Sequence, residues 1–101
     1  MKSEEDAGSV RNRMDQELRK AQSELAKSSV EATAGRGAVK VTMSGTQECL
    51  SVEIVDDILQ SGDVRHLEGL VLLAVNQAIR DSQLMAARRL SPFSGDLDPQ
   101  P

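Results

Sequence analysis

The chain has 101 residues, a formal net charge of −4 and a single aromatic side chain, Phe93. A chain of this length forms one domain with a modest core. The shortage of aromatic rings argues against a surface that stacks on single-stranded bases, and the negative charge argues against a general polycation.

The sequence also predicts where the protein resides. Its longest unbroken apolar run, Leu70 to Val75, is far shorter than the roughly 20 residues of a membrane-spanning helix. The first residues, MKSEED, lack the apolar segment of a secretory signal. The single cysteine, Cys49, has no partner for an internal disulfide. We therefore expect a cytoplasmic protein.

A helix is predicted from Ser9 to about Ser28, after an acidic segment over residues 1–8 that we expect to be flexible. Apolar residues recur there at every third or fourth position: Val10, Met14, Leu18, Ala21 and Leu25. The stripe is narrow, like the seam of a coiled coil, so most of the helix should face water.

Three strands are predicted next, because apolar and polar residues alternate. The first is short and contains Val30, Ala32 and Ala34; the others contain Val39, Val41 and Met43, and then Leu50, Val52 and Ile54. We expect one buried and one wet face. Gly35-Arg36-Gly37 forms the first turn, and it lacks the helix and lysine that follow a phosphate-binding loop. Gly45 should supply a positive φ in the second turn.

A short helical turn is predicted at Val55–Leu59, followed by a long helix from Val64 to Leu90 with Asp63 as its N-cap. The middle of this helix is apolar on nearly every side, and one small sheet covers only one side. We therefore expect a second copy of the chain to cover the rest. The expected interface residues are Leu70, Val71, Leu73, Ala74, Val75, Ala78 and Ile79. Residues 91–101, with three prolines, are expected to form a disordered tail.

No catalytic centre is predicted. The only histidine, His66, lies on the first turn of the long helix, where a surface or capping role is typical. Cys49 has no neighbouring motif that would make it a reactive thiolate, so we expect a small buried side chain. Asp56 and Asp57 are adjacent and diverge, which disfavours a metal site. We expect no enzyme activity, no cofactor and no metal.

Two segments of the sequence resemble those of a known family. VEATAGRGAVKVTMSG at residues 30–45 and LEGLVLLAVNQA at residues 67–78 resemble the YbaB/EbfC family of bacterial nucleoid-associated proteins. The similarity covers about residues 14–90, with departures at Val55, where the family has aspartate, and at Gly69. The resemblance implies a non-catalytic homodimer with protruding helical arms that binds DNA in the nucleoid.

We predict an α+β fold: a long N-terminal helix, a three-stranded antiparallel sheet and a long C-terminal helix, paired in an intertwined homodimer. The domain should span residues 9–90. The predicted function is binding of double-stranded DNA with low sequence specificity, and thereby nucleoid organisation or gene expression. The alternative is a non-catalytic adaptor dimer whose helical arms bind another protein, which the acidic composition alone slightly favours.

Clustered cations on the first helix are the predicted DNA contacts, because a dimer doubles every patch and local charge decides contact. They are Arg11, Arg13, Arg19 and Lys20. A second group of candidates lies elsewhere in the chain: Arg36, Lys40, Arg88 and Arg89. The competing interpretation is that the helix cations only pair with Asp15, Glu17 and Glu24 on the same helix. No recognition helix rich in base-reading side chains is evident, so binding should be salt-sensitive and weakly specific.

Overall fold

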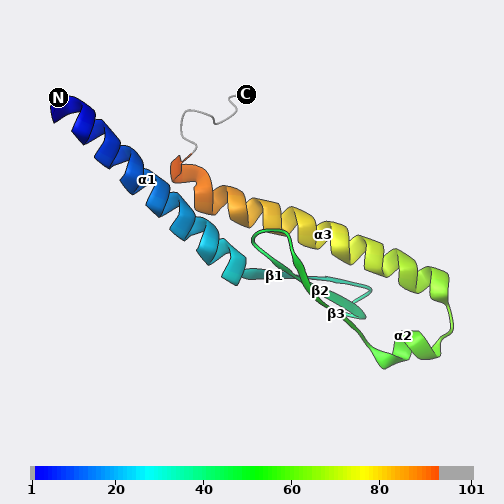
Figure 1. Cartoon of the computed structure of the whole chain (residues 1–101). Helices are drawn as coiled ribbons and strands as arrows, with labels where there is room; N and C mark the ends of the chain where they lie inside the picture. Colours follow the sequence, from blue (N-terminus) through cyan, green and yellow to red (C-terminus); the bar gives the residue numbers. More distant parts are fainter. Residues whose placement is uncertain (1, 94–101) are drawn as a thin grey trace, which may run out of the picture.

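The computed structural model describes the backbone of residues 2–93 and the side chains of residues 10–93. The elements are α1 (Lys2–Lys27), β1 (Ser29–Ala34), β2 (Val39–Ser44), β3 (Cys49–Ile54), α2 (Asp56–Gln60), α3 (Val64–Leu90) and η1 (Ser91–Phe93). Figure 1 shows the two long helices meeting near the C-terminal end of α3, from where α1 projects away from the sheet. The predicted order of helix, three strands and helix is confirmed.

Two predicted boundaries differ from the structure. Helix α1 begins at Lys2 rather than at Ser9. The acidic sequence of residues 4–6 is compatible with a helix N-terminus, because the helix dipole favours negative charge there. At the other end, Ser91–Phe93 form a short 3-10 turn, whereas the rest of the expected tail lies outside the described residues.

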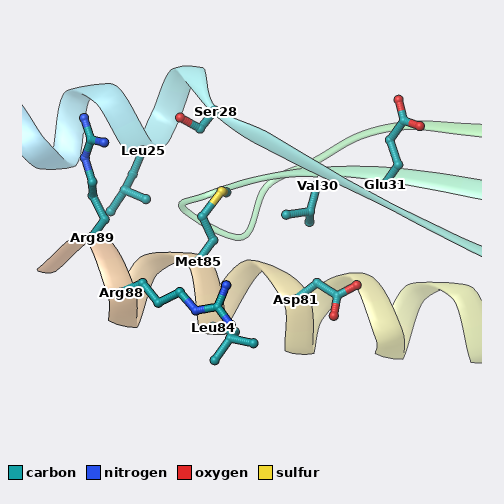
Figure 2. Close-up of a pocket in the computed structure, with 9 residues that line it drawn as sticks. All are labelled: Leu25, Ser28, Val30, Glu31, Asp81, Leu84, Met85, Arg88 and Arg89. Atoms are coloured by element: carbon teal, nitrogen blue, oxygen red, sulfur yellow. The ribbon is translucent and has the colours of Figure 1, made fainter. Parts of the chain in front are cut away.

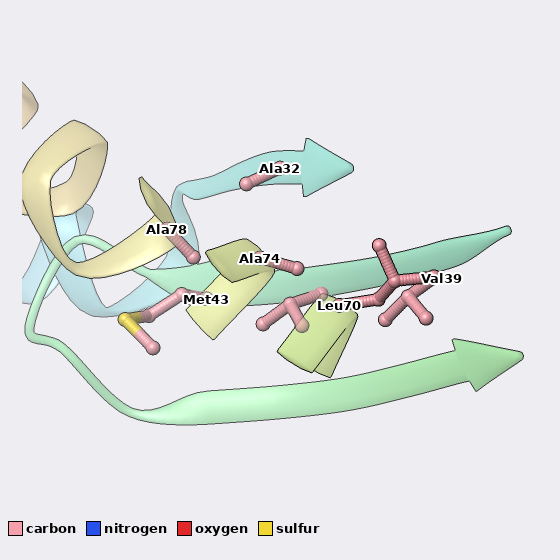
Figure 3. Close-up of a cluster of buried hydrophobic side chains, with 7 residues drawn as sticks. Ala32, Val39, Met43, Leu70, Ala74 and Ala78 are labelled. Atoms are coloured by element: carbon pink, nitrogen blue, oxygen red, sulfur yellow. The ribbon is translucent and has the colours of Figure 1, made fainter. Parts of the chain in front are cut away.

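The three strands form an antiparallel sheet in the order β1-β2-β3. Val41 is paired with Ala32 on one side and with Val52 on the other, so the apolar residues of all three strands share one face. Helix α3 packs on this face (Figure 3) and contributes Leu70, Ala74 and Ala78 at a spacing of four. The small alanines let the helix approach the sheet closely, and Val39 and Val41 become fully buried.

The expectation that β3 is buried on one face is wrong for Leu50 and Val52, whereas Ile54 is half-buried and packs against the core. Helix α3 lies over β1 and β2, and Leu50 and Val52 on β3 stay 53% and 46% exposed. Cys49, expected to be a small buried residue, is exposed. The helix covers only two strands of the sheet, and β3 therefore presents an uncovered apolar face.

Gly45 serves close packing rather than a positive φ. The left-handed residue of the second turn is Gln47, with φ of 66°. A Cβ on Gly45 would lie 2.6 Å from the carbonyl oxygen of Leu25. The first turn is as predicted, since Gly35, Arg36 and Gly37 all have positive φ.

The start of α3 follows the sequence signal. The side chain of Asp63 accepts a hydrogen bond of 3.0 Å from the backbone N–H of His66, which confirms the predicted N-cap. Before it, α2 confirms the short helical turn, and Gly62 follows with φ of 75°. Among the helices of residues 2–93, none combines the length and apolar character that crossing a membrane requires.

Candidate nucleic-acid interface

The charges of α1 are segregated around the helix. Arg13, Lys20 and Lys27 are spaced by seven residues, so they lie on one line with about 10.5 Å between neighbours. Arg19 lies on the other side of the same outward surface. All four side chains are exposed. We call these four cations the basic face of α1; Lys27 is not among the cations predicted from the sequence, although its seven-residue spacing from Lys20 identifies it.

The described acidic residues of α1, which are Asp15, Glu17 and Glu24, lie outside this outward surface. At 3.6 residues per turn, Glu17 and Glu24 flank the seam on one side and Asp15 flanks it on the other. Arg11 also lies beside the seam rather than on the basic face. The outward surface of α1 between residues 12 and 27 thus carries cations and neutral side chains, although the whole chain is acidic.

The cations of the basic face form no ion pair with the described acidic side chains of α1. Among the described side chains, the ion pairs within 4.0 Å are Lys40 with Glu31, Lys40 with Glu53, and Arg89 with Glu24. Glu24, which stands one turn from Lys20, therefore pairs with α3 instead. Arg13 and Lys20 stand four residues before Glu17 and Glu24, which is the weaker order for a helical pair, whereas Asp15 stands four residues before Arg19 in the stronger order. This geometry favours an available basic face over a helix laced with ion pairs.

Lys40 is occupied by its neighbours on the sheet. Its Nζ lies 2.9 Å from Glu53 Oε2 and 3.9 Å from Glu31 Oε2. The hydrogen bond to Glu53, followed by the charges of Glu31 and Glu53, raises the pKa of Lys40. With two carboxylates around one ammonium group, this site is locally acidic and poorly suited to a phosphate.

The remaining candidate cations are dispersed. Arg36 sits in the β1–β2 turn and shares a pocket with His66, near the start of α3 and away from the arm. Arg88 and Arg89 lie at the other end of α3, close to α1. Figure 2 shows Arg89 directed towards α1, where it meets Glu24. Arg88 therefore lies near α1, whereas Arg36 and Lys40 lie away from this helix.

A groove of about 720 Å³ lies where α1, β1 and α3 meet (Figure 2). Leu25, Val30, Leu84 and Met85 form its apolar part, and Asp81 and Arg88 bring charge to it. Within the described part of the chain, no three His, Cys, Asp or Glu side chains gather as a metal site requires.

A second surface is apolar and uncovered. It consists of Leu50 and Val52 on β3 together with the adjoining flank of α3, where a pocket is lined by Leu67, Glu68, Val71, Leu72 and Val75. We call it the β3–α3 surface. Leu72 is 62% exposed. An apolar surface of this kind marks an interaction site.

The residues of the expected dimer interface differ in burial and lie on different sides of α3. Leu70, Ala74 and Ala78 are buried in the core of their own chain. Val71 and Val75 are half-buried and belong to the β3–α3 surface, and Ile79, also half-buried, lies on the same flank of α3. Leu73 is 62% exposed, but the helix turn of about 100° from Leu72 directs it to the other side of α3.

Known proteins with similar sequences identify the family of this chain. The model of the YbaB/EbfC DNA-binding family matches residues 5–97. A nucleoid-associated protein of Thermoanaerobacter pseudethanolicus is 45% identical over 85 residues, which are 84% of this chain and 77% of that protein. A nucleoid-associated protein of Chloroflexus aurantiacus is 40% identical over 84 residues, which are 83% of this chain and 84% of that protein.

The fold is also similar to a solved structure. The crystal structure of an uncharacterized protein from Helicobacter pylori matches with a TM-score of 0.73 and 18% identity, over 91% of this chain and 94% of that chain. At this identity the match shows the fold alone. The resemblance predicted from the sequence is confirmed by the family model and the two relatives: the chain belongs to the YbaB/EbfC DNA-binding family.

Proposed function

We propose that this chain is a nucleoid-associated protein that binds duplex DNA as a homodimer, through the basic face of α1. The observation that carries the proposal is the segregation of charge on α1: Arg13, Arg19, Lys20 and Lys27 share the outward surface and form no ion pair with another described side chain. Phosphates are recognised by such exposed cations. The names of the two relatives agree with a role in the nucleoid.

The homodimer is supported by the β3–α3 surface. Leu50, Val52 and Leu72 would remain in contact with water in a monomer, and burying apolar area is the main favourable term in association. A two-fold dimer places the same patch against itself, so one uncovered surface is sufficient. The pairing gives each dimer two copies of α1 and therefore two basic faces.

Low sequence specificity follows from the kind of side chain on the arm. Arginine and lysine on one line can contact successive phosphates, which fix position but carry no sequence information directly. The outward surface has Asn12 and Gln16 as its amide side chains, too few for a recognition helix that reads several bases. We expect affinities for unrelated duplexes to agree closely.

The test is a titration of fluorescently labelled duplexes of unrelated sequence at several salt concentrations. Changing Arg13, Lys20 and Lys27 to Gln should weaken binding and lower the slope of log K against log salt by close to one for each cation that binds a phosphate in the wild type. A matched control removes the same charge elsewhere, with Arg36, Arg65 and Arg80 changed to Gln. Absence of binding by the wild type, or an equal slope for both triple variants, would contradict the proposal.

A second function is favoured by one observation. Val10 and Met14, at the outer end of the seam, are each 52% exposed, so the arm also offers an apolar stripe to another protein. Changing both to Ser should leave DNA affinity intact if the basic face binds DNA. If that variant no longer binds DNA, the apolar stripe of α1 is required for binding and the basic face is not sufficient.

A further inference from the structure

The last turns of α1 are attached to the rest of the chain through two separate contacts. One is the ion pair between Glu24 and Arg89 of α3. The other is the β2–β3 turn, where the backbone N–H of Gly45 donates to the carbonyl oxygens of Leu25 and Ser28, each at 3.0 Å. Leu25 lies in the last turn of α1 and Ser28 directly follows the helix, where carbonyl groups need hydrogen-bond donors from outside the helix. The turn therefore caps the helix.

The same turn is anchored to α3. Ser82 Oγ donates a hydrogen bond of 2.7 Å to the carbonyl oxygen of Ser44, and both residues are almost fully buried. The contacts form a closed path from α3 through Ser44 and Gly45 to α1, and back through Glu24 and Arg89. We call the residues of this path the latch: Glu24, Leu25, Ser44, Gly45, Ser82 and Arg89.

The burial of α1 changes sharply outside the latch. Leu25 and Ala21 are buried, at 4% and 8% exposure, whereas Met14 and Val10 are 52% exposed. The part of α1 that carries Arg13 and Arg19 thus projects from a single attachment at its C-terminal end. The direction of the projecting part depends on how the latch holds that end.

We propose that the latch is a positioning device, which sets the direction of α1 and thereby the DNA affinity of the basic face without itself touching DNA. The inference rests on the proposed function. A fixed arm binds without the loss of conformational freedom that a swinging arm suffers on binding. Arg89, expected from the sequence to contact DNA, is assigned instead to holding the arm.

For one substitution, electrostatic attraction and the positioning of α1 predict opposite changes in DNA affinity. Glu24→Gln removes a negative charge from α1, which by electrostatics alone should strengthen binding to phosphates. If the latch positions the arm, the same change should weaken binding by about threefold, the size of an exposed ion pair. Glu17→Gln is the matched control, because Glu17 is exposed on the same flank and forms no ion pair with another described side chain.

The direction of the arm is measurable without DNA. Spin labels on Gln16→Cys and Gln83→Cys, in a Cys49→Ser background, report the distance from the arm to α3. Dilution with unlabelled protein ensures that each measured pair belongs to one chain. Glu24→Gln should broaden or shift the distance distribution, whereas Glu17→Gln should leave it unchanged. The exchanged pair, Glu24→Arg with Arg89→Glu, should restore both the narrow distribution and the wild-type affinity.

The outcomes separate the latch from the proposed function. An unchanged distance in Glu24→Gln, with DNA binding strengthened as in Glu17→Gln, would overturn the latch while the arm remains the DNA-binding surface. A changed distance with unchanged affinity would also overturn it, because position would then not govern binding. A wild type that binds no DNA overturns the proposed function and, with it, a latch that acts on DNA affinity.

Discussion

Ser82 on α3 donates a hydrogen bond of 2.7 Å to the backbone carbonyl of Ser44, across 38 positions of sequence and with both residues buried. Removing the donor deletes one buried hydrogen bond, worth about 0.5–1.5 kcal/mol, and leaves the carbonyl of Ser44 with the N–H of Gln47, at 3.0 Å, as a partner. We expect Ser82→Ala to lower the free energy of unfolding by about that amount in a denaturant titration. Ser61→Ala is the control, because its hydroxyl makes a similar bond of 2.7 Å at an exposed site. Equal losses of unfolding free energy in Ser82→Ala and Ser61→Ala would show that burial does not strengthen the hydrogen bond of Ser82.

Two glycine substitutions should act with opposite sign. A Cβ at Gly45 would lie 2.6 Å from Leu25 O, a backbone atom, whereas a Cβ at Gly69 meets nothing within 4 Å. Gly45→Ala should therefore destabilise the fold, by about 1–3 kcal/mol as for overpacking. Gly69→Ala, inside helix α3, should stabilise it by up to about 1 kcal/mol. Thermal unfolding of both variants checks the prediction, which is wrong if the two melting temperatures move in the same direction.

The β3–α3 surface predicts how the oligomer responds to charge. Val52→Asp places a carboxylate in the proposed interface, where an unpaired charge is costly, and should reduce the sedimenting mass or cause aggregation. Ser51→Asp puts the same group on the other face of β3 and should leave the mass at twice that of one chain. A wild type that sediments as a stable monomer at micromolar concentration would contradict the dimer.

Lys40 gives a pH prediction with a definite sign. Its folded-state pKa is raised above 10.5 by Glu53 and Glu31. A raised pKa of a cation stabilises the fold fully below the unfolded pKa, and this contribution is lost as the pH rises through the folded pKa. The stability difference between wild type and Lys40→Gln should therefore shrink from pH 8 to about pH 11. A difference that is constant or grows over this range would show that the two carboxylates do not hold the ammonium group.

Lys40→Gln should also leave the salt slope of DNA binding unchanged, because the carboxylates of Glu31 and Glu53 surround the ammonium group. A slope lowered by close to one would instead identify Lys40 as a phosphate contact. The measurement tests Lys40, which the sequence ranks after the cations of α1, as a DNA contact.

Local patterns predicted most of the fold. Alternation identified β2, the aspartate before an apolar helix identified the cap at Asp63, and the positive φ of Gly35 and Gly37 follows from the turn they form. The role of Gly45 was not predictable in this way. Its close approach to Leu25 depends on how α1 crosses the β2–β3 turn, which is a tertiary relationship without a local signal.

The candidate site was predicted in part, for a similar reason. Periodicity placed the cations of α1 on a solvated helix, and spacing alone would have added Lys27. Whether Glu24 pairs with Lys20 or with Arg89 is decided by the packing of α3 against α1. The exposure of Leu50 and Val52 depends on how many strands α3 covers, and alternation along β3 predicts a buried face without saying what covers it.

We expect DNA to lie on the outward surface of α1, and site-specific photo-crosslinking detects this contact. A photo-reactive side chain at Gln16, between Arg13 and Lys20 on that surface, should crosslink to a duplex, and the yield should fall as salt rises. The same group at Gln60, on α2, should not crosslink. Crosslinking at Gln60 but not at Gln16, in a complex that forms with wild-type affinity, would contradict the account.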